Sequence, residues 1–382
     1  MALVQPPAVM AGTTPNATTT APLPVPAETI APPPDSSFSE TVGGAALATV
    51  GAPVVSATAP PLPAVEAPAW LVADLDSGSV LAALDAHAPL PPASTLKLLT
   101  ALAVLPSVDA GETYTATEHD ARTEGSRVGL VPDHQYTVAD LEHGLLLASG
   151  NDAASALAAI VGGDARAAAL MNDEAARLGA FDTNAVNPHG LDAPGQASSA
   201  YDLALIARAV LADDHLADLV RTSTYDFPGM DGATFQIQNH NRLLGDYAGT
   251  IGLKTGYTDR SGHTLVAAAE REGSRLVAVV LGSEGRAEPV AQALLDWGFA
   301  ARAQAEPVGT LVTPEQVAAA VAASAQSQSP PANQSDTAAN AVDTEQDAAW
   351  LWAAAAAAGV AAVSLNRWRR RRRPAGRYAE RV

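Results

Sequence analysis

Short apolar runs open and close the central part of the chain. Residues 70–75 and 80–84 form two such runs, and they flank a turn sequence, residues 76–79, that contains Gly78. Two apolar runs about a glycine-containing turn are typical of a β-hairpin. Further along, three more runs are separated by polar turn residues and predict strands over residues 252–257, 264–269 and 275–281.

Helical periodicity fills the sequence between these strands. The apolar stretch 95–105 follows a proline pair and Ser94, which are ordinary signals of a helix start. Apolar residues then recur with a helical period over 138–212, and an amphipathic stretch covers 288–299. Strands at both ends with helices between them predict an α+β fold, in which helices flank an antiparallel sheet and form an inserted subdomain.

Low-complexity sequence sets the predicted limits of this domain. Residues 1–66 contain thirteen prolines and neither lysine nor arginine, and they predict a disordered leader. Within it, residues 43–59 are mildly apolar and end like a signal-peptide cleavage site, but without a preceding basic residue a linker is favoured. Residues 303–347 predict a second linker that could include a short helix over residues 313–325. The globular domain is expected over residues 67–302, long enough for a large core.

The C-terminal sequence joins an apolar stretch to a basic tail. Residues 348–365 carry no charge, and residues 366–382 contain eight arginines and one glutamate. Eighteen apolar residues are near the minimum for a transmembrane helix, and arginines beyond it favour the cytoplasmic side. We therefore expect a single-pass cell-membrane protein with residues 1–347 outside the cytoplasm. The alternative is an alanine-rich soluble helix followed by a tail that binds nucleic acid or lipid.

Charge and composition exclude several classes of function. The tail carries a net charge of +7. Because the whole chain has a formal net charge of −19, the remaining residues carry −26. A body this acidic is unsuited to nucleic acid, whose phosphates require clustered cations. The absence of cysteine excludes disulfides, zinc–thiolate sites and cysteine nucleophiles. No pattern of metal ligands is evident, and no cofactor is expected.

Lysine is nearly absent, and both lysines lie in recognisable motifs. Lys97 and Lys254 stand against twenty arginines. Arginine replaces lysine where only a charge is needed, but it cannot replace an amine that must lose its proton. Ser94 and Lys97 are three residues apart on a predicted helix, so their side chains share one face. An amine with a lowered pKa can accept the proton of a serine hydroxyl and make it a nucleophile, and Lys254 could supply the cation that lowers it.

Two further motifs are informative when they are considered together with Ser94 and Lys97. Ser149, Gly150 and Asn151 form a predicted loop between helices, where a hydroxyl can relay a proton and an amide can bind a peptide group. Lys254, Thr255 and Gly256 lie in a predicted strand, whose edge can bind an extended substrate and whose polar side chains suit a carboxylate. Taken alone, the first of these two motifs is better explained as an ordinary helix cap and the second as an ordinary strand.

Together, in this order on helix, loop and strand, the three motifs are much more specific. They match the S-x-x-K, S-D-N and K-T-G set of penicillin-binding proteins and class A β-lactamases. Over residues 67–302 the chain most resembles the D-alanyl-D-alanine carboxypeptidases of the low-molecular-mass penicillin-binding protein type, peptidase family S11. Ser149-Gly150-Asn151 is the carboxypeptidase-like form of the second motif. The resemblance is supported by the sequences around residues 92–97, 147–154, 187–192, 200–203 and 252–258.

The resemblance implies a role for each motif residue. Ser94 would be the acylated nucleophile, Lys97 its base and Ser149 a proton shuttle. Asn151 would bind the substrate amide, and Lys254 and Thr255, followed by Gly256, would bind the terminal carboxylate. The N–H groups of Ser94 and Tyr257 would form the oxyanion hole.

Two histidines near the motifs are interpreted differently. His240 stands where some family members carry an arginine near the carboxylate, so that contact is in doubt. His189 is surrounded by the turn formers Asn187, Pro188 and Gly190 and is interpreted as part of a structural turn.

The leading hypothesis is a serine D,D-carboxypeptidase that removes the terminal D-Ala from peptidoglycan stem pentapeptides and is inhibited by β-lactams. A β-lactamase is the alternative, but no Glu-x-x-Leu-Asn sequence lies between the second and third motifs to activate a deacylating water. A third hypothesis is a non-catalytic, membrane-anchored penicillin-binding or sensor protein, although a 17-residue tail is short for a signalling domain.

Overall fold

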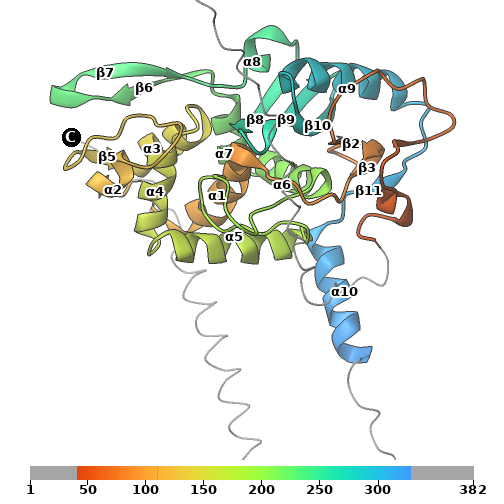
Figure 1. Ribbon diagram of the computed structural model, residues 1–382, viewed down its shortest axis with the longest axis horizontal. Coiled ribbons are helices and arrows are strands. Elements are labelled where there is room, and N and C mark those ends of the chain that lie inside the picture. Colours follow the sequence, from red (N-terminus) through yellow and green to blue (C-terminus); the bar gives the residue numbers. More distant parts are fainter. Residues whose placement is uncertain (1–40, 110, 328–382) are drawn as a thin grey trace, which may run out of the picture. The chain divides into compact units, whose positions relative to one another are not determined.

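A seven-stranded antiparallel sheet organises the protein. The computed structural model describes residues 41–109 and 111–327. The strand order is β1-β3-β2-β10-β9-β8, and β11 also pairs with β3 (Figure 1). The strands are β1 (Val54–Val55), β2 (Ala69–Asp74), β3 (Ser79–Leu84), β8 (Thr250–Thr258), β9 (Gly262–Arg271), β10 (Ser274–Ser283) and β11 (Gly309–Thr310). The predicted hairpin and the three predicted later strands are thus confirmed, and β8 lies at one edge of the sheet.

The two faces of the sheet bury two separate sets of side chains. Alternate residues of β10 divide between them: Val277 and Val279 belong to one core cluster, and Ala278 and Val280 to the other. This follows from the period of two along a strand, where every residue in this stretch is apolar because both faces are covered. The second cluster is completed by α9 (Ala287–Ala301), which packs on β9 and β10.

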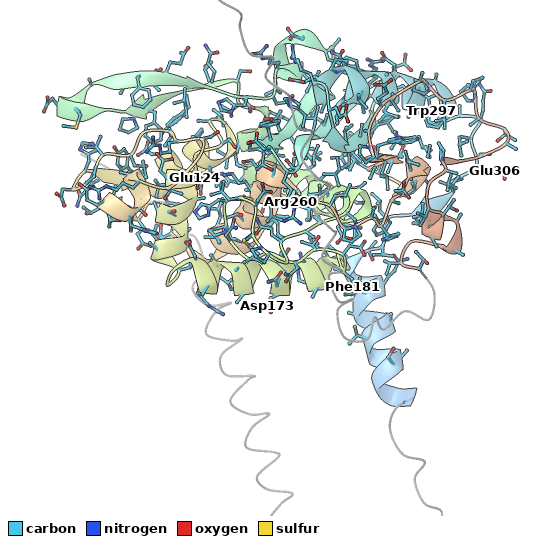
Figure 2. All side chains as sticks on the ribbon, viewed as in Figure 1. Glu124, Asp173, Phe181, Arg260, Trp297 and Glu306 are labelled. Carbon is cyan, nitrogen blue, oxygen red and sulfur yellow. The ribbon has the colours of Figure 1, made fainter. Side chains whose placement is uncertain are left out.

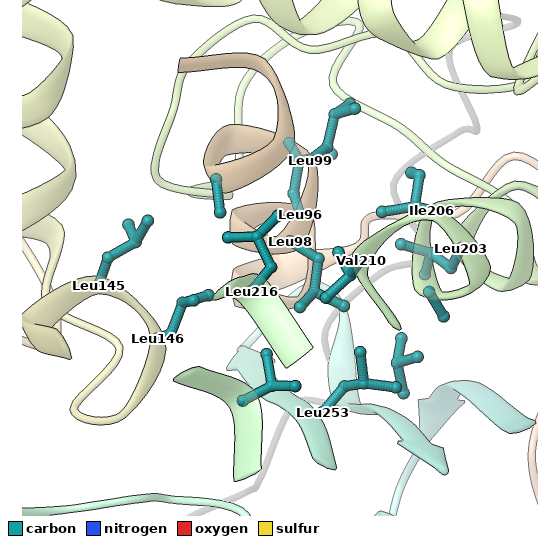
Figure 3. Packing of buried hydrophobic residues seen from close by; sticks show 14 of the residues in the cluster. Leu96, Leu98, Leu99, Leu145, Leu146, Leu203, Ile206, Val210, Leu216 and Leu253 are labelled. Carbon is teal, nitrogen blue, oxygen red and sulfur yellow. The ribbon is translucent and has the colours of Figure 1, made fainter. Parts of the chain in front are cut away.

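The helical part of the molecule covers the other face. It contains α1 (Lys97–Val104), α2 (Glu118–Ala121), α3 (Val138–Leu146), α4 (Asn151–Ile160), α5 (Asp164–Leu178), α6 (Ala200–Ala212) and α7 (Asp214–Arg221). Apolar side chains from α1, α3, α6, α7 and β8 meet in one cluster (Figure 3). The structure is therefore an α+β fold, as the sequence predicted.

Local sequence explains where these helices begin. Thr137 and Asp140 form a reciprocal capping box at the start of α3, and the side chain of Ser199 accepts a hydrogen bond from the N–H of Asp202 at the start of α6. The C-terminal end of α5 is followed by Gly179. Its φ of 82° is the left-handed conformation that ends many helices.

Two small hairpins stand outside the main sheet. One pairs β4 (Thr113–Thr115) with β5 (Gln135–Thr137), and the other pairs β6 (Thr224–Pro228) with β7 (Thr234–Gln238). The β6–β7 hairpin projects from the body of the domain (Figure 1). After β7 the chain passes through α8 (Leu243–Asp246) into β8, so this segment runs directly to the edge of the main sheet.

The domain extends beyond its predicted limits at both ends. Residues 41–66 belong to the predicted disordered leader, but Leu47 is buried and β1 pairs with β3. The indole N–H of Trp297, which is labelled in Figure 2, donates to the carbonyl oxygen of Pro60. Residues 303–327 fall in the predicted linker, but β11 pairs with β3, while the short helix expected over residues 313–325 is confirmed as α10 (Pro314–Ser327). The domain described by the structure therefore starts before residue 67 and continues past residue 302.

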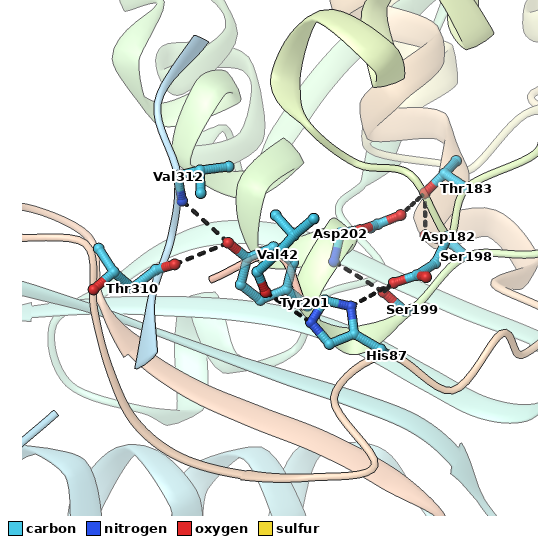
Figure 4. Close-up of polar contacts among 10 residues, drawn as sticks. All are labelled: Val42, His87, Asp182, Thr183, Ser198, Ser199, Tyr201, Asp202, Thr310 and Val312. Atoms are coloured by element: carbon cyan, nitrogen blue, oxygen red, sulfur yellow. Dashed lines mark hydrogen bonds and ion pairs between the residues drawn. The ribbon is translucent and has the colours of Figure 1, made fainter. Parts of the chain in front are cut away.

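A tyrosine on α6 fixes the C-terminal extension. The hydroxyl of Tyr201 donates to the carbonyl oxygen of Thr310 at 2.8 Å and accepts from the N–H of Val312 at 3.1 Å (Figure 4). On the other side of the tyrosine ring, the Nε2 atom of His87 lies 3.1 Å from the carbonyl oxygen of Val42. Hydrogen bonds within one small region thus hold segments from both ends of the domain.

Within residues 41–109 and 111–327, no single helix is both long and apolar enough to cross a membrane. The helices α4 and α5 are long and apolar enough only when they are counted together, and they meet at an angle of 89°. The predicted transmembrane segment 348–365 and basic tail 366–382 lie outside the described residues, as do residues 1–40 of the predicted leader.

Candidate active site

Ser94 and Lys97 are in direct contact at the start of α1. Ser94 lies in a 3₁₀ turn, η2 (Ala93–Leu96), and Lys97 is the first residue of α1. Residues three apart are eclipsed in a 3₁₀ turn, so the two side chains meet, with 2.9 Å between Lys97 Nζ and Ser94 Oγ. The sequence predicted a helix at both residues, and the structure places only Lys97 in the α-helix.

The amine of Lys97 is buried and has three oxygen neighbours. Besides Ser94 Oγ, it lies 2.6 Å from the Oδ1 atom of Asn151 and donates to the carbonyl oxygen of His189. Burial, and after it the charge of Lys254, hold the pKa of Lys97 well below its usual value, whereas the charge of Asp152 acts to raise it. This environment favours the neutral amine.

A neutral amine fixes the direction of the contact with Ser94. It has two N–H donors and one lone pair, whereas the carbonyl oxygens of Asn151 and His189 can only accept. These two oxygens therefore occupy both N–H groups of the amine. In the neutral form the lone pair remains for the hydroxyl of Ser94, so the serine proton points at the atom that can remove it, whereas in the charged form a third N–H of the amine donates to Ser94 Oγ.

The second motif lies in the turn between α3 and α4. Ser149 has a φ of 59°, a left-handed conformation that serine adopts only at an energetic cost, and Asn151 is the first residue of α4. The Nδ2 atom of Asn151 donates to the carbonyl oxygen of Glu124 at 2.5 Å. Because that carbonyl can only accept, the amide is oriented with Oδ1 towards Lys97.

The third motif brings the edge strand β8 against the serine. A Cβ atom on Gly256 would lie 2.7 Å from the backbone nitrogen of Ser94, so only glycine permits this approach. The side chain of Lys254 is buried, and burial lowers its pKa to about 7. Its charge acts on Lys97, so both lysines belong to one electrostatic unit.

A cavity of about 610 Å³ runs along these motifs. Of the predicted site residues, Ser94, Ser149, Thr255, Gly256 and Tyr257 line it. Lys97, Asn151 and Lys254 are buried and do not line the cavity, but Lys97 contacts Ser94 and Asn151, and Lys254 adjoins Thr255 in β8. The structure therefore brings all eight predicted site residues to one site.

The cavity also contains residues that the sequence did not single out. They are Ser126, Gln238, Asn239, Arg242, His263, Arg286 and Glu288. The guanidinium of Arg286 hydrogen-bonds the carboxylate of Glu288, whereas that of Arg242 has no hydrogen bond or ion pair with the described residues. No local pattern marks Arg242. Its only signal in the sequence is its position two residues after His240.

Both histidines of interest contact this site. His240 lines the cavity, and burial followed by the charges of Lys254 and Lys97 lowers its pKa. His189 lies in a turn, as predicted, because Asn187 Oδ1 accepts from the N–H groups of His189 and Gly190. The structure adds that the carbonyl oxygen of His189 binds Lys97, while its Nε2 atom lies 2.9 Å from Ser155 Oγ.

These atoms can support serine acyl transfer without a bound metal. A hydroxyl, a neutral amine and a nearby backbone N–H converge where a carbonyl carbon could lie against the strand edge. Among residues 41–109 and 111–327, no group of three or more His, Cys, Asp or Glu side chains is arranged to hold a metal ion.

Comparisons with known proteins point to the same chemistry. The model of a peptidase family, described as D-alanyl-D-alanine carboxypeptidase, matches residues 54–285. The chain is 45% identical over 258 residues to the D-alanyl-D-alanine carboxypeptidase DacB2 of Mycobacterium tuberculosis, with 66% of this chain and 88% of that protein covered. It is 36% identical to DacD of Escherichia coli, covering 63% and 64% of the two chains.

Solved structures agree in fold. A crystal structure of a D-alanyl-D-alanine carboxypeptidase from Mycobacterium tuberculosis has a TM-score of 0.65 and 43% identity, with 68% of this chain and 100% of that chain covered. A mutant of the Streptomyces K15 DD-transpeptidase has a TM-score of 0.59 at 28% identity, with 62% and 99% covered.

Proposed function

The chain belongs to the D-alanyl-D-alanine carboxypeptidase family, and from this premise we propose that Ser94 is its acylated nucleophile. As a member, it is a serine hydrolase that acts on the D-Ala-D-Ala end of peptidoglycan peptides and binds β-lactams. The observation that carries the assignment is the contact between Ser94 Oγ and Lys97 Nζ, at 2.9 Å, with two carbonyl oxygens occupying the amine's N–H groups.

The first half of the reaction forms the acyl-enzyme. Lys97 takes the hydroxyl proton as Ser94 Oγ attacks the carbonyl carbon of the penultimate D-Ala. The N–H groups of Ser94 and Tyr257 stabilise the oxyanion, a contribution of a few kcal/mol in such sites. The peptide bond then breaks as Ser149 delivers a proton to the nitrogen of the departing D-Ala and takes one from Lys97, which returns the amine to its neutral state.

The second half returns the free enzyme. A water molecule, deprotonated by the same base, attacks the ester carbonyl, and the proton returns to Ser94 as its C–O bond breaks. During both halves Asn151 binds the peptide amide, and Lys254 with Thr255 binds the terminal carboxylate. A penicillin would place its own carboxylate and strained amide at the same positions.

The test is release of D-Ala from a stem pentapeptide, together with mass spectrometry of the protein after penicillin treatment. We expect release and an adduct on Ser94 in the wild type, and neither in Ser94→Ala. Ser126→Ala is the matched control, because Ser126 lines the same cavity but has no contact with Lys97 among the described residues. An adduct on another residue, or D-Ala release by Ser94→Ala, would refute the assignment.

Turnover of a chromogenic cephalosporin separates the proposal from a β-lactamase. We expect a long-lived adduct with little turnover, because no glutamate in the predicted arrangement is available to activate a deacylating water. Rapid hydrolysis would overturn this expectation. D-Ala release separates the enzyme from a sensor that only traps the acyl group.

We also propose that residues 348–365 anchor the chain in the cell membrane, with residues 366–382 in the cytoplasm and the catalytic domain outside. The uncharged stretch, the arginines after it and an extracellular substrate support this arrangement. Fractionation of cells that express the full chain, or a chain ending at residue 347, tests it. The full chain should be in the membrane fraction and the shortened chain should not. Equal distribution of both would refute the anchor.

A further inference from the structure

A buried carboxylate next to Asn151 holds the loop that forms one wall of the site. Asp152 is fully buried in the first turn of α4. Its Oδ1 atom accepts from the N–H of Val128 at 2.9 Å, and its Oδ2 atom accepts from those of Gly129 at 2.7 Å and Leu130 at 3.0 Å. Within the described part of the chain, no cation forms an ion pair with it. Three consecutive backbone donors replace a counter-charge, as in other anion sites made by peptide groups.

The segment fixed in this way carries two groups of the active site. Its first residue, Glu124, provides the carbonyl oxygen that orients the side-chain amide of Asn151. Ser126, two residues later, lines the cavity, and its carbonyl oxygen accepts from the N–H of Asn151 at 2.7 Å. Asn151 therefore binds the beginning of the loop and Asp152 binds its end, so two adjacent residues clamp residues 124–130.

The same carboxylate acts on the reactive amine. Its charge raises the pKa of Lys97 against the larger opposite effect of burial and against the charge of Lys254. A neutral residue at this position would leave the amine with a lower pKa. Loop geometry and amine basicity thus depend on one side chain that does not line the cavity.

We propose that Asp152 is a positioning residue for the carboxypeptidase reaction: it fixes loop 124–130, through which Asn151 is oriented towards Lys97, and it supplies the negative charge that accompanies the two buried lysines. This inference rests on the proposed roles of Ser94 and Lys97. It assigns to Asp152 no contact with the substrate. The residue acts through the loop and through the amine.

Asp152→Asn tests the proposal because the change keeps the shape and removes the charge. One of the two side-chain atoms becomes an NH₂ group, which cannot accept from the N–H groups it faces. We expect kcat/KM for D-Ala release to fall about 10-fold to 100-fold, as for a catalytic group that is misplaced. The acid limb of its pH profile should also move to lower pH, since Lys97 loses its proton more easily. Faster amide hydrogen exchange at Val128, Gly129 and Leu130 should accompany both changes.

Asp140→Asn is the matched control. Asp140 is also a buried acceptor at a helix start, bonded to the N–H and hydroxyl of Thr137 and to the hydroxyl of Tyr225, but it does not contact loop 124–130. We expect a loss of thermal stability with an unchanged pH profile. If Asp152→Asn behaves in the same way, with no shift of the acid limb, Asp152 is only structural and the proposal is wrong.

Two further measurements keep the test decisive. Asp152→Glu retains the charge, so its acid limb should stay at the wild-type pH even if the longer side chain lowers kcat and stability. If the acid limb of Asp152→Glu shifts as far as that of Asp152→Asn, the charge of Asp152 does not control the pKa of Lys97, and that half of the proposal is wrong. Wild-type D-Ala release and Ser94 labelling are measured alongside. If the wild type neither releases D-Ala nor is labelled on Ser94, the proposed function is wrong. If the wild type is active and Asp152→Asn matches it in activity and pH profile, only the role proposed for Asp152 is wrong.

Discussion

The carbonyl oxygen of Glu124 fixes which end of the Asn151 side chain faces the active site. The contact of 2.5 Å requires the NH₂ group of Asn151 at that position, because a backbone carbonyl cannot donate. The Oδ1 atom is thereby directed at Lys97 and occupies one of the amine's N–H groups. A single backbone carbonyl thus contributes to the arrangement in which the serine hydroxyl can donate to the neutral amine of Lys97.

Gly125 allows this contact, so its substitution should reduce acylation. Its φ is 84°, and a Cβ atom there would lie 2.8 Å from Asn151 Nδ2. We expect Gly125→Ala to displace the asparagine and lower the rate of penicillin acylation about 10-fold to 100-fold. Stopped-flow or gel-based labelling with a fluorescent penicillin measures that rate.

Gly129→Ala provides the comparison within the same loop. Gly129 also has a positive φ, 102°, but a Cβ atom there would meet no atom within 4 Å. Both variants carry backbone strain of about 1–2 kcal/mol, and only Gly125→Ala adds a clash with Asn151. Equal acylation rates in the two variants would show that strain in the loop, which Gly129 shares through its hydrogen bond to Asp152, and not the clash with Asn151, controls the reaction.

The hydroxyl of Tyr201 should stabilise the domain without affecting its chemistry. Tyr201→Phe removes the bond to the carbonyl oxygen of Thr310 and leaves the N–H of Val312 without its acceptor. Loss of a buried partner costs about 1–3 kcal/mol. We expect a lower Tm, faster hydrogen exchange at Val312 and an unchanged kcat/KM at 25 °C. A drop in kcat/KM with an unchanged Tm would contradict this assignment.

The sequence was most informative where chemistry requires rare residues and where periodicity is strong. Both lysines of a lysine-poor chain lie at the site, and the strands with continuous apolar runs were located from their pattern. The strands β1 and β11 could not be predicted, because each has only two residues, too few to show the alternating pattern of a strand. Their pairing with β3 depends on tertiary contacts instead, so both domain limits were placed wrongly.

Residues that act through the backbone could not be predicted in the same way. Glu124 contributes a carbonyl oxygen, which any residue has, so its side chain gives no signal. Asp152 resembles any acidic residue in the first turn of a helix, and only the fold brings residues 128–130 to it. Arg242 reaches the cavity because the segment after β7 runs along the edge of the sheet.

Arg242 should take part in discriminating a terminal carboxylate from an amide. His240 occupies the position where the resemblance suggested an arginine, whereas Arg242 lines the same cavity with an unpaired guanidinium among the described residues. An exposed charge contact contributes up to about 1 kcal/mol, or roughly fivefold. We expect Arg242→Gln to lower kcat/KM for a free-acid D-Ala-D-Ala peptide by about this factor and to leave the C-terminal amide analogue nearly unchanged.

Arg286→Gln is the control for this comparison. Its guanidinium lies in the same cavity but is bonded to Glu288, with 3.0 Å between the nearest nitrogen and oxygen. Arg242 also acts on the Glu288 carboxylate through its charge but has no hydrogen bond to it, so the charge of Arg286 is compensated more closely, and the acid-to-amide ratio should change less than in Arg242→Gln. Equal changes in the two variants would assign the discrimination to the general positive charge of the cavity, and no change in either would exclude both arginines.

The two buried lysines should each contribute one limb to the dependence of kcat/KM on pH. Lys97 must be neutral to accept the serine proton, so activity rises as pH passes its lowered pKa. Lys254 must remain charged to bind a carboxylate and to lower the pKa of Lys97, so activity falls as pH rises through its pKa of about 7. Since kcat/KM reports the free enzyme, the alkaline limb should begin near pH 7. In the pH profile of kcat, the alkaline limb should lie at higher pH, because a bound carboxylate stabilises the proton on Lys254.

Lys254→Arg identifies the group responsible for that limb. A guanidinium remains charged throughout the accessible pH range, so the alkaline decrease near pH 7 should disappear from kcat/KM. The maximum should fall as well, because the larger planar group must fit a space that is closed to solvent around Lys254. Lys97→Arg, which also keeps a permanent charge, should abolish acylation at every pH. An unchanged alkaline limb in Lys254→Arg would assign that titration to another group and would remove Lys254 from the proposed carboxylate site.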